Sequence, residues 1–316
     1  MRILVVGAGA TGGYFGGRLI QAGRDVTFLV RPGRAAALRE RGLRITGLGE
    51  QTVLEPKLVL ASEVTGPYDL VVLTVKEAGL EAAIADLAPA VGPDTLILPV
   101  LNGLRHVDAL VARFGERAVL GGLVLVASTV DANGDIVRLD TIGSMVYGAR
   151  DGQPDPRLDE LHRTLSGAGF DTELSADINT AMWAKWVFIA SICAVTCLMR
   201  GTIGEVEAVP GGAQFAEAVV AEAAGVAAAA GYPVPAANLA RARATVTKPG
   251  SPFASSLYRD LVGGNDIEVE QILGDLQTRG EALGVPVPLI SLVTMQLRVY
   301  QNRLRQERAQ GTAAPA

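Results

Sequence analysis

The chain has 316 residues, of which 49% are hydrophobic and 19% are charged, and it carries a formal net charge of -5 at pH 7. This composition excludes a disordered chain, because it supplies enough apolar surface for a folded core, and the length favours two domains. The acidic balance argues against a protein that binds nucleic acid without sequence preference, since such proteins need a basic surface.

The first half of the chain alternates short β-branched runs with helical stretches, which is typical of a parallel sheet built from βαβ units. The predicted elements in chain order are a strand at 3–6, a helix at 11–22, strands at 26–30 and 70–74, a helix at 77–87, a strand at 96–98 and a helix at 104–114. We therefore predict an α/β fold that begins with a doubly wound, Rossmann-type sheet.

A hairpin is predicted next, because β runs at 119–130 and 136–147 flank a turn that contains Asn133 and Gly134. Asn-Gly between two β runs is a strong hairpin signal. We expect this hairpin to form an antiparallel edge on the same sheet. One more helix follows the turn-rich loop at 151–156.

After the segment 170–176 the strand signals stop, so the second domain is expected to be all-α. Its helices are predicted at 177–199, 213–230, 236–244, 254–262, 268–283 and 290–306. The expected domains are 1–175 and 176–310, followed by a tail of small residues at 311–316 that is expected to be disordered.

The stretch 181–199 is apolar almost all round and long enough to span a bilayer. Lys185 lies inside it, however, and its flanks carry no cluster of positive charge. A helix that is hydrophobic on every side is otherwise a core helix. We therefore expect no membrane partner and a lysine within a buried helix.

The cysteines and histidines predict neither a metal site nor a disulfide framework. Cys193 and Cys197 lie one helical turn apart, which suits side-chain contact better than a redox disulfide, and His106 and His162 are far from both in sequence. The apolar run at the start of the chain is too short for a signal segment, so we expect a cytoplasmic protein.

A G-x-G-x-x-G motif follows the first predicted strand and opens the first helix. Its residues are Gly7, Ala8, Gly9, Ala10, Thr11 and Gly12. The first glycine allows the tight turn, the second lets the backbone approach a pyrophosphate, and the third lets helix and strand pack closely. The motif predicts dinucleotide binding, with a purely structural glycine turn as the alternative.

The end of the second strand indicates which dinucleotide is bound. NAD sites carry a carboxylate there, whereas this strand ends in Val30 followed by Arg31, with Arg34 close behind. A guanidinium pairs well with a phosphate, so the sequence favours NADP(H). The alternative is a solvated surface arginine.

Lysine is rare in this chain, which draws attention to two of its four lysines, Lys76 and Lys185. Lys76 and Asn102 follow predicted strands and so lie where open α/β sheets bind ligands, although a surface lysine and a simple turn remain the alternatives. Burial lowers the pKa of a lysine such as Lys185 and lets it donate a proton near neutral pH, which arginine cannot do. An ion pair in the helical core is the other interpretation of Lys185.

Taken together, these residues resemble the ketopantoate reductase (2-dehydropantoate 2-reductase) family over essentially the whole chain. Besides the glycine motif, the matching residues are Arg31, Lys76, Asn102-Gly103, Trp183-Ala184-Lys185, Ser255-Ser256-Leu257-Tyr258-Arg259-Asp260 and Glu268.

The resemblance implies reduction of ketopantoate to pantoate by NADPH, a step of pantothenate and CoA synthesis. Lys185 would give the proton to the carbonyl oxygen, Ser256 would hold the substrate carboxylate, and Asn102 would touch both substrate and cofactor. The further cofactor contacts it implies are Lys76, Ser128 and Glu268. The expected partner is thus a small 2-oxo acid, and a homodimer is left open.

The chain departs from the family where asparagines usually follow the catalytic lysine by four and eight residues. Ile189 and Cys193 stand there, on the face of the helix that carries Lys185. Apolar groups in these substrate-binding positions weaken discrimination for a hydroxyl. A more apolar carbonyl substrate is therefore an alternative to ketopantoate, and a non-catalytic NADP(H)-binding regulator is a third possibility.

Overall fold

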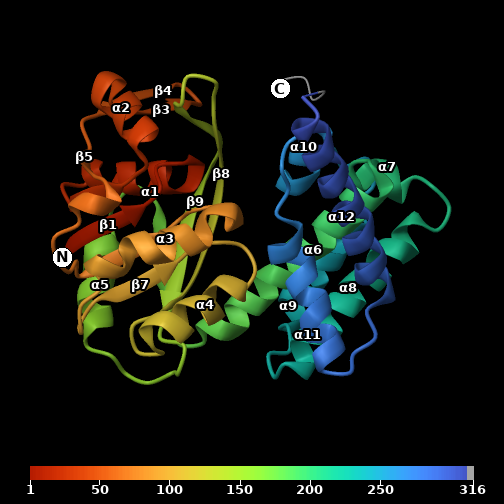
Figure 1. Ribbon diagram of the computed structural model, residues 1–316. Helices are drawn as coiled ribbons and strands as arrows, with labels where there is room; N and C mark the ends of the chain where they lie inside the picture. Colours follow the sequence, from red (N-terminus) through yellow and green to blue (C-terminus); the bar gives the residue numbers. More distant parts are fainter. Residues whose placement is uncertain (312–316) are drawn as a thin grey trace. The chain divides into compact units, whose positions relative to one another are not determined.

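The computed structural model describes residues 1–311, which form two compact units (Figure 1). Unit 1 consists of Met1–Leu101 and His106–Ile178, and unit 2 consists of Asn102–Arg105 and the chain from Asn179 onward. The sequence did not predict that the short segment 102–105 belongs to the second unit. The expected tail at 311–316 lies outside the described residues, apart from Gly311.

The first sheet of unit 1 is parallel, with the strand order β5-β2-β1-β6-β7. Its strands are β1 (Arg2–Val6), β2 (Asp25–Leu29), β5 (Lys57–Val59), β6 (Leu70–Leu73) and β7 (Leu96–Pro99). Both β6 and β7 are buried along their whole length, which explains their continuous runs of branched aliphatic residues. The predicted Rossmann-type sheet is confirmed.

The predicted hairpin is present, but its expected place at the edge of that sheet is wrong. It belongs to a second sheet, with the order β10-β9-β3-β4 and β8 paired to β9. The strands are β3 (Leu43–Gly47), β4 (Glu50–Leu54), β8 (Gly121–Val130), β9 (Ile136–Gly148) and β10 (Asp171–Leu174). The physical reason is that β9 pairs with β3 and β10, two strands that the sequence pattern did not predict.

Helix α1 (Ala10–Gln21) packs between the two sheets of unit 1, and its glycines make this close approach possible. A Cβ at Gly16 would lie 2.4 Å from the Phe28 ring on β2, whereas a Cβ at Gly17 would lie 2.7 Å from Ile45 on β3. The other helical segments of unit 1 are α2 (Pro32–Arg41), η1 (Ala61–Glu63), η2 (Glu77–Gly79), α3 (Leu80–Leu87), η3 (Ala88–Ala90), α4 (Arg105–Phe114) and α5 (Arg157–Leu165).

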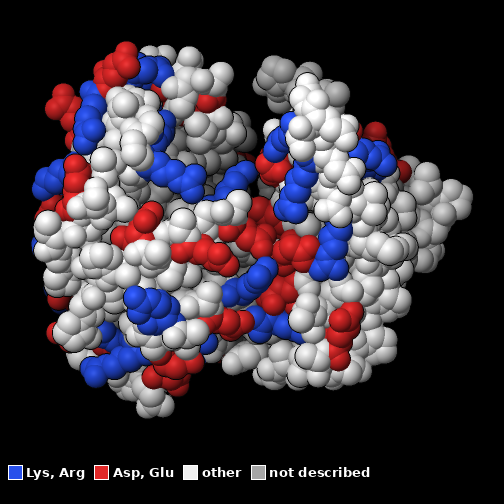
Figure 2. Space-filling model, viewed as in Figure 1, with Lys and Arg blue, Asp and Glu red and all other residues white. Residues whose placement is uncertain are grey.

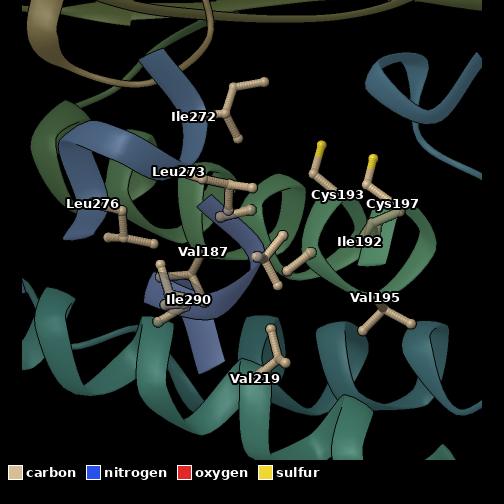
Figure 3. Packing of buried hydrophobic residues seen from close by; sticks show 14 of the residues in the cluster. Val187, Ile192, Cys193, Val195, Cys197, Val219, Ile272, Leu273, Leu276 and Ile290 are labelled. Carbon is tan, nitrogen blue, oxygen red and sulfur yellow. The ribbon is translucent and has the colours of Figure 1, made fainter. Parts of the chain in front are cut away.

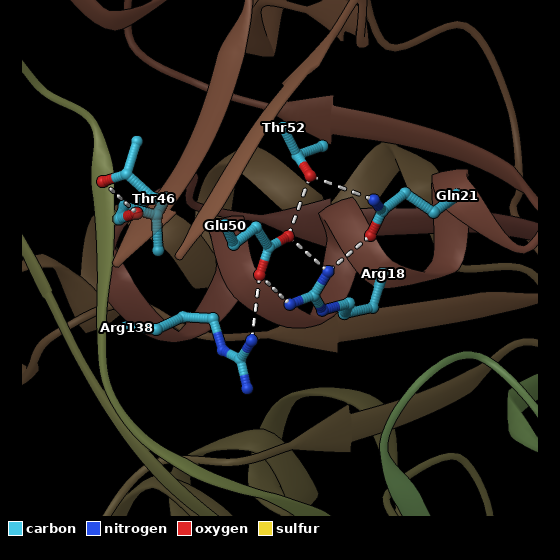
Figure 4. A network of polar contacts seen from close by, with 7 residues as sticks. Arg18, Gln21, Thr46, Glu50, Thr52 and Arg138 are labelled. Carbon is cyan, nitrogen blue, oxygen red and sulfur yellow. Dashed lines mark hydrogen bonds and ion pairs between the residues drawn. The ribbon is translucent and has the colours of Figure 1, made fainter. Parts of the chain in front are cut away.

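A polar network joins α1 to the second sheet through Glu50 (Figure 4). Arg18 on α1 binds both oxygens of the Glu50 carboxylate, at 2.7 and 2.6 Å, and Arg138 on β9 binds one of them at 2.9 Å. The hydrogen bond from Arg18 is the largest of the interactions that hold the pKa of Glu50 at about 2, below its ordinary value of 4.5. Elsewhere basic and acidic side chains are interspersed on the face shown in Figure 2.

Glu50→Gln is expected to lower the free energy of unfolding by about 2 kcal/mol at neutral pH, because two half-buried guanidinium groups lose their anionic partner. Since the pKa of Glu50 is lower in the folded state, its contribution is fully present above about pH 4.5 and is lost as the pH falls toward 2. Denaturant unfolding from neutral pH to about pH 3 measures this difference. Glu116→Gln, which removes an exposed partner of Arg150, is the control, and a difference that does not change with pH would contradict this explanation.

Unit 2 is all-α, as predicted. Its segments are α6 (Ile178–Met199), α7 (Ile203–Glu207), α8 (Gly212–Ala229), α9 (Ala236–Val246), α10 (Ser256–Val262), the π-helical turn η4 (Glu270–Gly274), α11 (Asp275–Ala282) and α12 (Pro288–Ala309). The helix predicted at 268–283 is thus partly wrong, because its first part is a π-helical turn.

Helix α6 forms the core of unit 2. Figure 3 shows Val187 of α6 close to Ile290 of α12, with Val219 of α8 in the same buried cluster. By length and composition α6 could cross a membrane, but 72% of its most apolar window is buried inside the structure. Its hydrophobic surface is therefore explained by packing against the other helices.

Candidate active site

The glycine-rich loop between β1 and α1 has the geometry of a dinucleotide cradle. Gly7 adopts a φ of +97°, and a Cβ at Gly12 would lie 2.1 Å from the Gly7 carbonyl oxygen, so the fold itself requires these two glycines. A Cβ at Gly9 would meet no atom within 4 Å. The middle glycine therefore borders open space, as the close approach of a pyrophosphate requires.

The carbonyl oxygens of this loop accept hydrogen bonds from neighbouring elements. Thr74, just after β6, donates to the carbonyl of Val6 at 2.8 Å and lies 3.1 Å from that of Gly7. The Ser128 hydroxyl on β8 donates to the Ala10 carbonyl at 3.2 Å. With the carbonyls held in this way, the first N–H groups of α1, which have no acceptor within the helix, are suited to bind an anion.

The two arginines that follow β2 lie in different surroundings. Arg34 donates to the carbonyl of Ala8 at 2.9 and 3.2 Å and to that of Gly134 at 2.9 Å, and burial lowers its pKa. It thus ties the glycine-rich loop to the hairpin turn. Arg31 is exposed and precedes the first turn of α2, and a Cβ at Gly79 would lie 3.4 Å from its Nη2.

Lys76 follows β6 and immediately precedes the short helix η2, where it is exposed. Because β2 and β6 are parallel strands on either side of β1, Lys76 and Arg31 both lie at the carboxyl ends of strands in one sheet. This edge is where open α/β sheets bind their ligands.

In unit 2 the structure brings Lys185 and Asn102 together. The Lys185 Nζ donates to the Asn102 Oδ1 at 3.2 Å, and burial lowers the pKa of Lys185 to about 8. The partner is a neutral amide, and within residues 1–311 Lys185 forms no ion pair. The alternative of an ion pair in the helical core therefore does not apply to Lys185. A lysine with this pKa is mostly protonated at neutral pH and still able to release its proton.

The π-helical turn η4 contacts Asn102 and Trp186, the residue that follows Lys185, which the sequence did not predict. The Gln271 side chain donates from Nε2 to the Asn102 carbonyl, and the Trp186 indole donates to the Ile272 carbonyl at 2.9 Å. In sequence Gln271 directly follows Glu270 and so carried no signal that distinguished it from the neighbouring polar residues. Such π-helical turns are frequent at functional sites.

The other predicted substrate positions lie along α6 and at the start of α10. Ile189 is half-buried and Cys193 is 2% exposed, whereas Ser256 is exposed as the first residue of α10. Burial is the main cause that raises the pKa of Cys193, and the neighbouring Cys197 raises it further.

Both thiols are free and point to the same side of α6 (Figure 3). Burial raises the pKa of Cys193 and raises that of Cys197 to about 12, which disfavours the reactive thiolate. The two cysteines thus act as small apolar groups of the helix, as expected from their spacing.

Comparisons with known proteins agree with this arrangement. The family model for ketopantoate reductase PanE/ApbA matches residues 3–152, and the model for its C-terminal part matches residues 177–301. The uncharacterized oxidoreductase YkpB of Bacillus subtilis is 33% identical over 301 residues, which cover 95% of this chain and 99% of that protein.

Two solved structures extend the comparison to the fold. A PanE/ApbA family ketopantoate reductase from Ralstonia eutropha has a TM-score of 0.86 at 25% identity, covering 96% of this chain and 100% of its own. D-mandelate dehydrogenase, solved with NADH and anilino(oxo)acetate, has a TM-score of 0.85 at 22% identity, covering 96% of this chain and 100% of its own. This similarity is one of fold alone. The two family models and the bacterial relative show that this chain is an oxidoreductase of the ketopantoate reductase family.

Proposed function

We propose that this protein reduces a 2-oxo acid to a 2-hydroxy acid with NADPH, and that Lys185 donates the proton. The observation that carries the proposal is the partly buried amine of Lys185, held by a neutral partner, Asn102, 3.2 Å away. A bound nicotinamide cofactor would supply the hydride to the carbonyl carbon. Lys185 gives its proton to the carbonyl oxygen as negative charge develops there, and the neutral amine left behind is protonated again from water.

The remaining site residues have supporting roles in this proposal. Asn102 accepts one N–H of Lys185 and so directs the other two toward the substrate, and Ser256 holds the substrate carboxylate. The residues proposed to hold the cofactor are the glycine motif from Gly7 to Gly12, together with Arg31, Lys76, Asn102, Ser128 and Glu268.

NADPH is proposed over NADH because of the arginines at the end of β2. Arg34 donates hydrogen bonds to the carbonyls of Ala8 and Gly134. The exposed Arg31 is therefore the guanidinium suited to a 2′-phosphate. A carboxylate, which would hold the ribose hydroxyls of NAD, does not occur at positions 30 and 31.

For the substrate we propose a 2-oxo acid with an apolar side chain as the alternative to ketopantoate. Ile189 and Cys193 provide no strong hydrogen-bond donor. The two nearby hydroxyls of α6 are engaged within the helix, since Ser191 donates to the Val187 carbonyl and Thr196 to the Ile192 carbonyl, each at 2.7 Å. Thr196 also lies 3.0 Å from the Ser255 hydroxyl, whose oxygen accepts from a backbone N–H. Thr196 is therefore already engaged and is a poor partner for a substrate hydroxyl.

An apolar 2-oxo acid is expected to be reduced with a higher kcat/KM than ketopantoate, by about tenfold or more, because an unpaired buried hydroxyl costs about 1 to 3 kcal/mol. Steady-state kinetics on a series of 2-oxo acids with lengthening alkyl chains tests this. Ile189→Asn, which restores the usual residue, should narrow the difference. If ketopantoate is instead preferred by about tenfold, ketopantoate is the substrate and another group or a water binds its hydroxyl.

A cytoplasmic location stays a prediction of this proposal, and the homodimer stays open. The regulator alternative is separated by the same kinetics, since it requires tight NADPH binding without oxidation of the cofactor by any carbonyl compound in the series.

A further inference from the structure

We propose that Gln271, in the π-helical turn η4, is a positioning residue that acts on Lys185 through Asn102. This inference rests on the proposed function, in which Lys185 is the proton donor. It concerns a residue that does not touch the reacting atoms and works by orienting one that does.

Asn102 is held at both ends. Its backbone carbonyl accepts the hydrogen bond from Gln271 Nε2, and its side-chain Oδ1 accepts the hydrogen bond from Lys185 Nζ at 3.2 Å. Gln271 is 1% exposed, so its amide has no access to bulk water as a substitute partner. Loss of the Gln271 amide would leave the Asn102 backbone without this donor in a buried setting.

The backbone next to Asn102 adds a second contact with η4, and this contact restricts the orientation of Asn102. Gly103 adopts a φ of +74°, and a Cβ there would lie 2.1 Å from the Gln271 carbonyl oxygen. The backbone of η4 therefore lies directly against Gly103, while the Gln271 side chain holds the preceding residue. Together these two contacts fix the direction in which the Asn102 side chain leaves the chain.

The same turn also holds the helix that carries Lys185. Trp186, the next residue on α6, is 1% exposed and donates its indole N–H to the carbonyl of Ile272 at 2.9 Å. Consecutive residues of η4 thus contact Asn102 itself and Trp186, the neighbour of Lys185 on α6. The wider π-helical turn at this point is consistent with a role in keeping Lys185 Nζ within hydrogen-bond distance of Asn102 Oδ1.

The chemical consequence concerns the protonated amine. Burial lowers the pKa of Lys185, and no charged side chain contributes to this shift within residues 1–311. A fixed amide oxygen near the amine favours its charged form. A freer Asn102 would therefore lower the pKa of Lys185 further and reduce the time the ammonium spends aimed at the substrate.

Gln271→Met keeps the length of the side chain and removes its donor. We expect kcat to fall about tenfold and the pKa of Lys185 to fall by about 0.5 to 1. The pKa is measured by NMR on protein whose lysines carry an isotope label at Cε, since the chain has four lysines and hence four resonances to assign. Each of the other three lysines is an internal control.

Thr294→Val is the matched control, because it also removes a buried side-chain donor to a carbonyl in unit 2, that of Ile290 at 2.7 Å. It should lower the melting temperature without moving the pKa of Lys185 or kcat. If Gln271→Met changes only the melting temperature in the same way, Gln271 is merely structural and the proposal is overturned.

Two further measurements keep the result unambiguous. Should Gln271→Met fail to fold, Trp186→Phe removes the second contact of η4 and is expected to shift the Lys185 pKa in the same direction, and an unshifted pKa counts against the proposal. Because the titration needs no turnover, it decides the role of Gln271 even if the wild-type protein reduces none of the 2-oxo acids. That second outcome would instead refute the proposed function.

Discussion

Lys185→Ala is expected to lower kcat by at least about a hundredfold, the usual contribution of a general acid, while the affinity for NADPH stays nearly intact. The reason is that the variant removes the one amine held against Asn102 and leaves the glycine-rich loop of unit 1 unchanged. Steady-state kinetics with the best 2-oxo acid, together with fluorescence titration of NADPH, measures both quantities.

Two companion results sharpen this test. Lys185→Arg should also be poor, because a guanidinium does not release its proton in this pH range. In the wild-type enzyme kcat/KM should fall above about pH 8, where Lys185 loses its proton, and the alanine variant should lack this dependence. Near-normal turnover by Lys185→Ala would mean that Glu268 or water supplies the proton.

Arg31→Asp is expected to weaken NADPH binding by about a hundredfold relative to NADH. The change removes charge-assisted hydrogen bonds to the 2′-phosphate, worth about 1.5 to 3 kcal/mol, and adds a carboxylate that repels it and can hold the ribose hydroxyls. The dissociation constants of both cofactors for both proteins provide the measurement.

Arg39→Asp is the matched control, since it makes the same change of charge at an exposed position of α2, the helix that Arg31 precedes. It should leave the ratio of the two affinities nearly unchanged. If Arg31→Asp also leaves the ratio unchanged, Arg31 does not contact the 2′-phosphate, and the preference for NADPH loses its support.

Local sequence signals predicted those elements whose side chains carry a clear pattern. The buried strands β1, β6 and β7 are runs of branched aliphatic residues, and the glycine motif lies between β1 and α1 as its spacing requires. Lys185 stood out because a charged residue interrupts an apolar helix. These features depend on neighbours in sequence, which is why the sequence was sufficient for them.

Strands β4 and β10 of the second sheet and helix α2 were missed because most of their residues are only partly buried or exposed. Strand β4 alternates between half-buried and exposed residues, and α2 is rich in alanine and arginine without a clear apolar face. Their stability comes from pairing and ion pairs with distant segments, such as Glu50 with Arg18 and Arg138, and short-range patterns carry little trace of such contacts.

The contacts around Lys185 were missed for the same reason. Gln271 and Asn102 are 169 residues apart in the chain, and the π-helical turn that joins them has no characteristic sequence pattern. The grouping of the segment 102–105 with unit 2 likewise follows from tertiary contacts. Sequence reasoning could propose Lys185 and Asn102 separately, whereas only the fold shows that they are partners.

The most direct test of the account is the rate of NADPH oxidation, followed by absorbance, with a series of 2-oxo acids that includes ketopantoate, for the wild-type protein and Lys185→Ala side by side. If Lys185 is the proton donor, at least one 2-oxo acid oxidises NADPH about a hundredfold faster with the wild-type protein than with the variant. If no member of the series is reduced faster by the wild-type protein than by the variant, Lys185 is not the proton donor of a 2-oxo acid reductase, and the proposed function is contradicted.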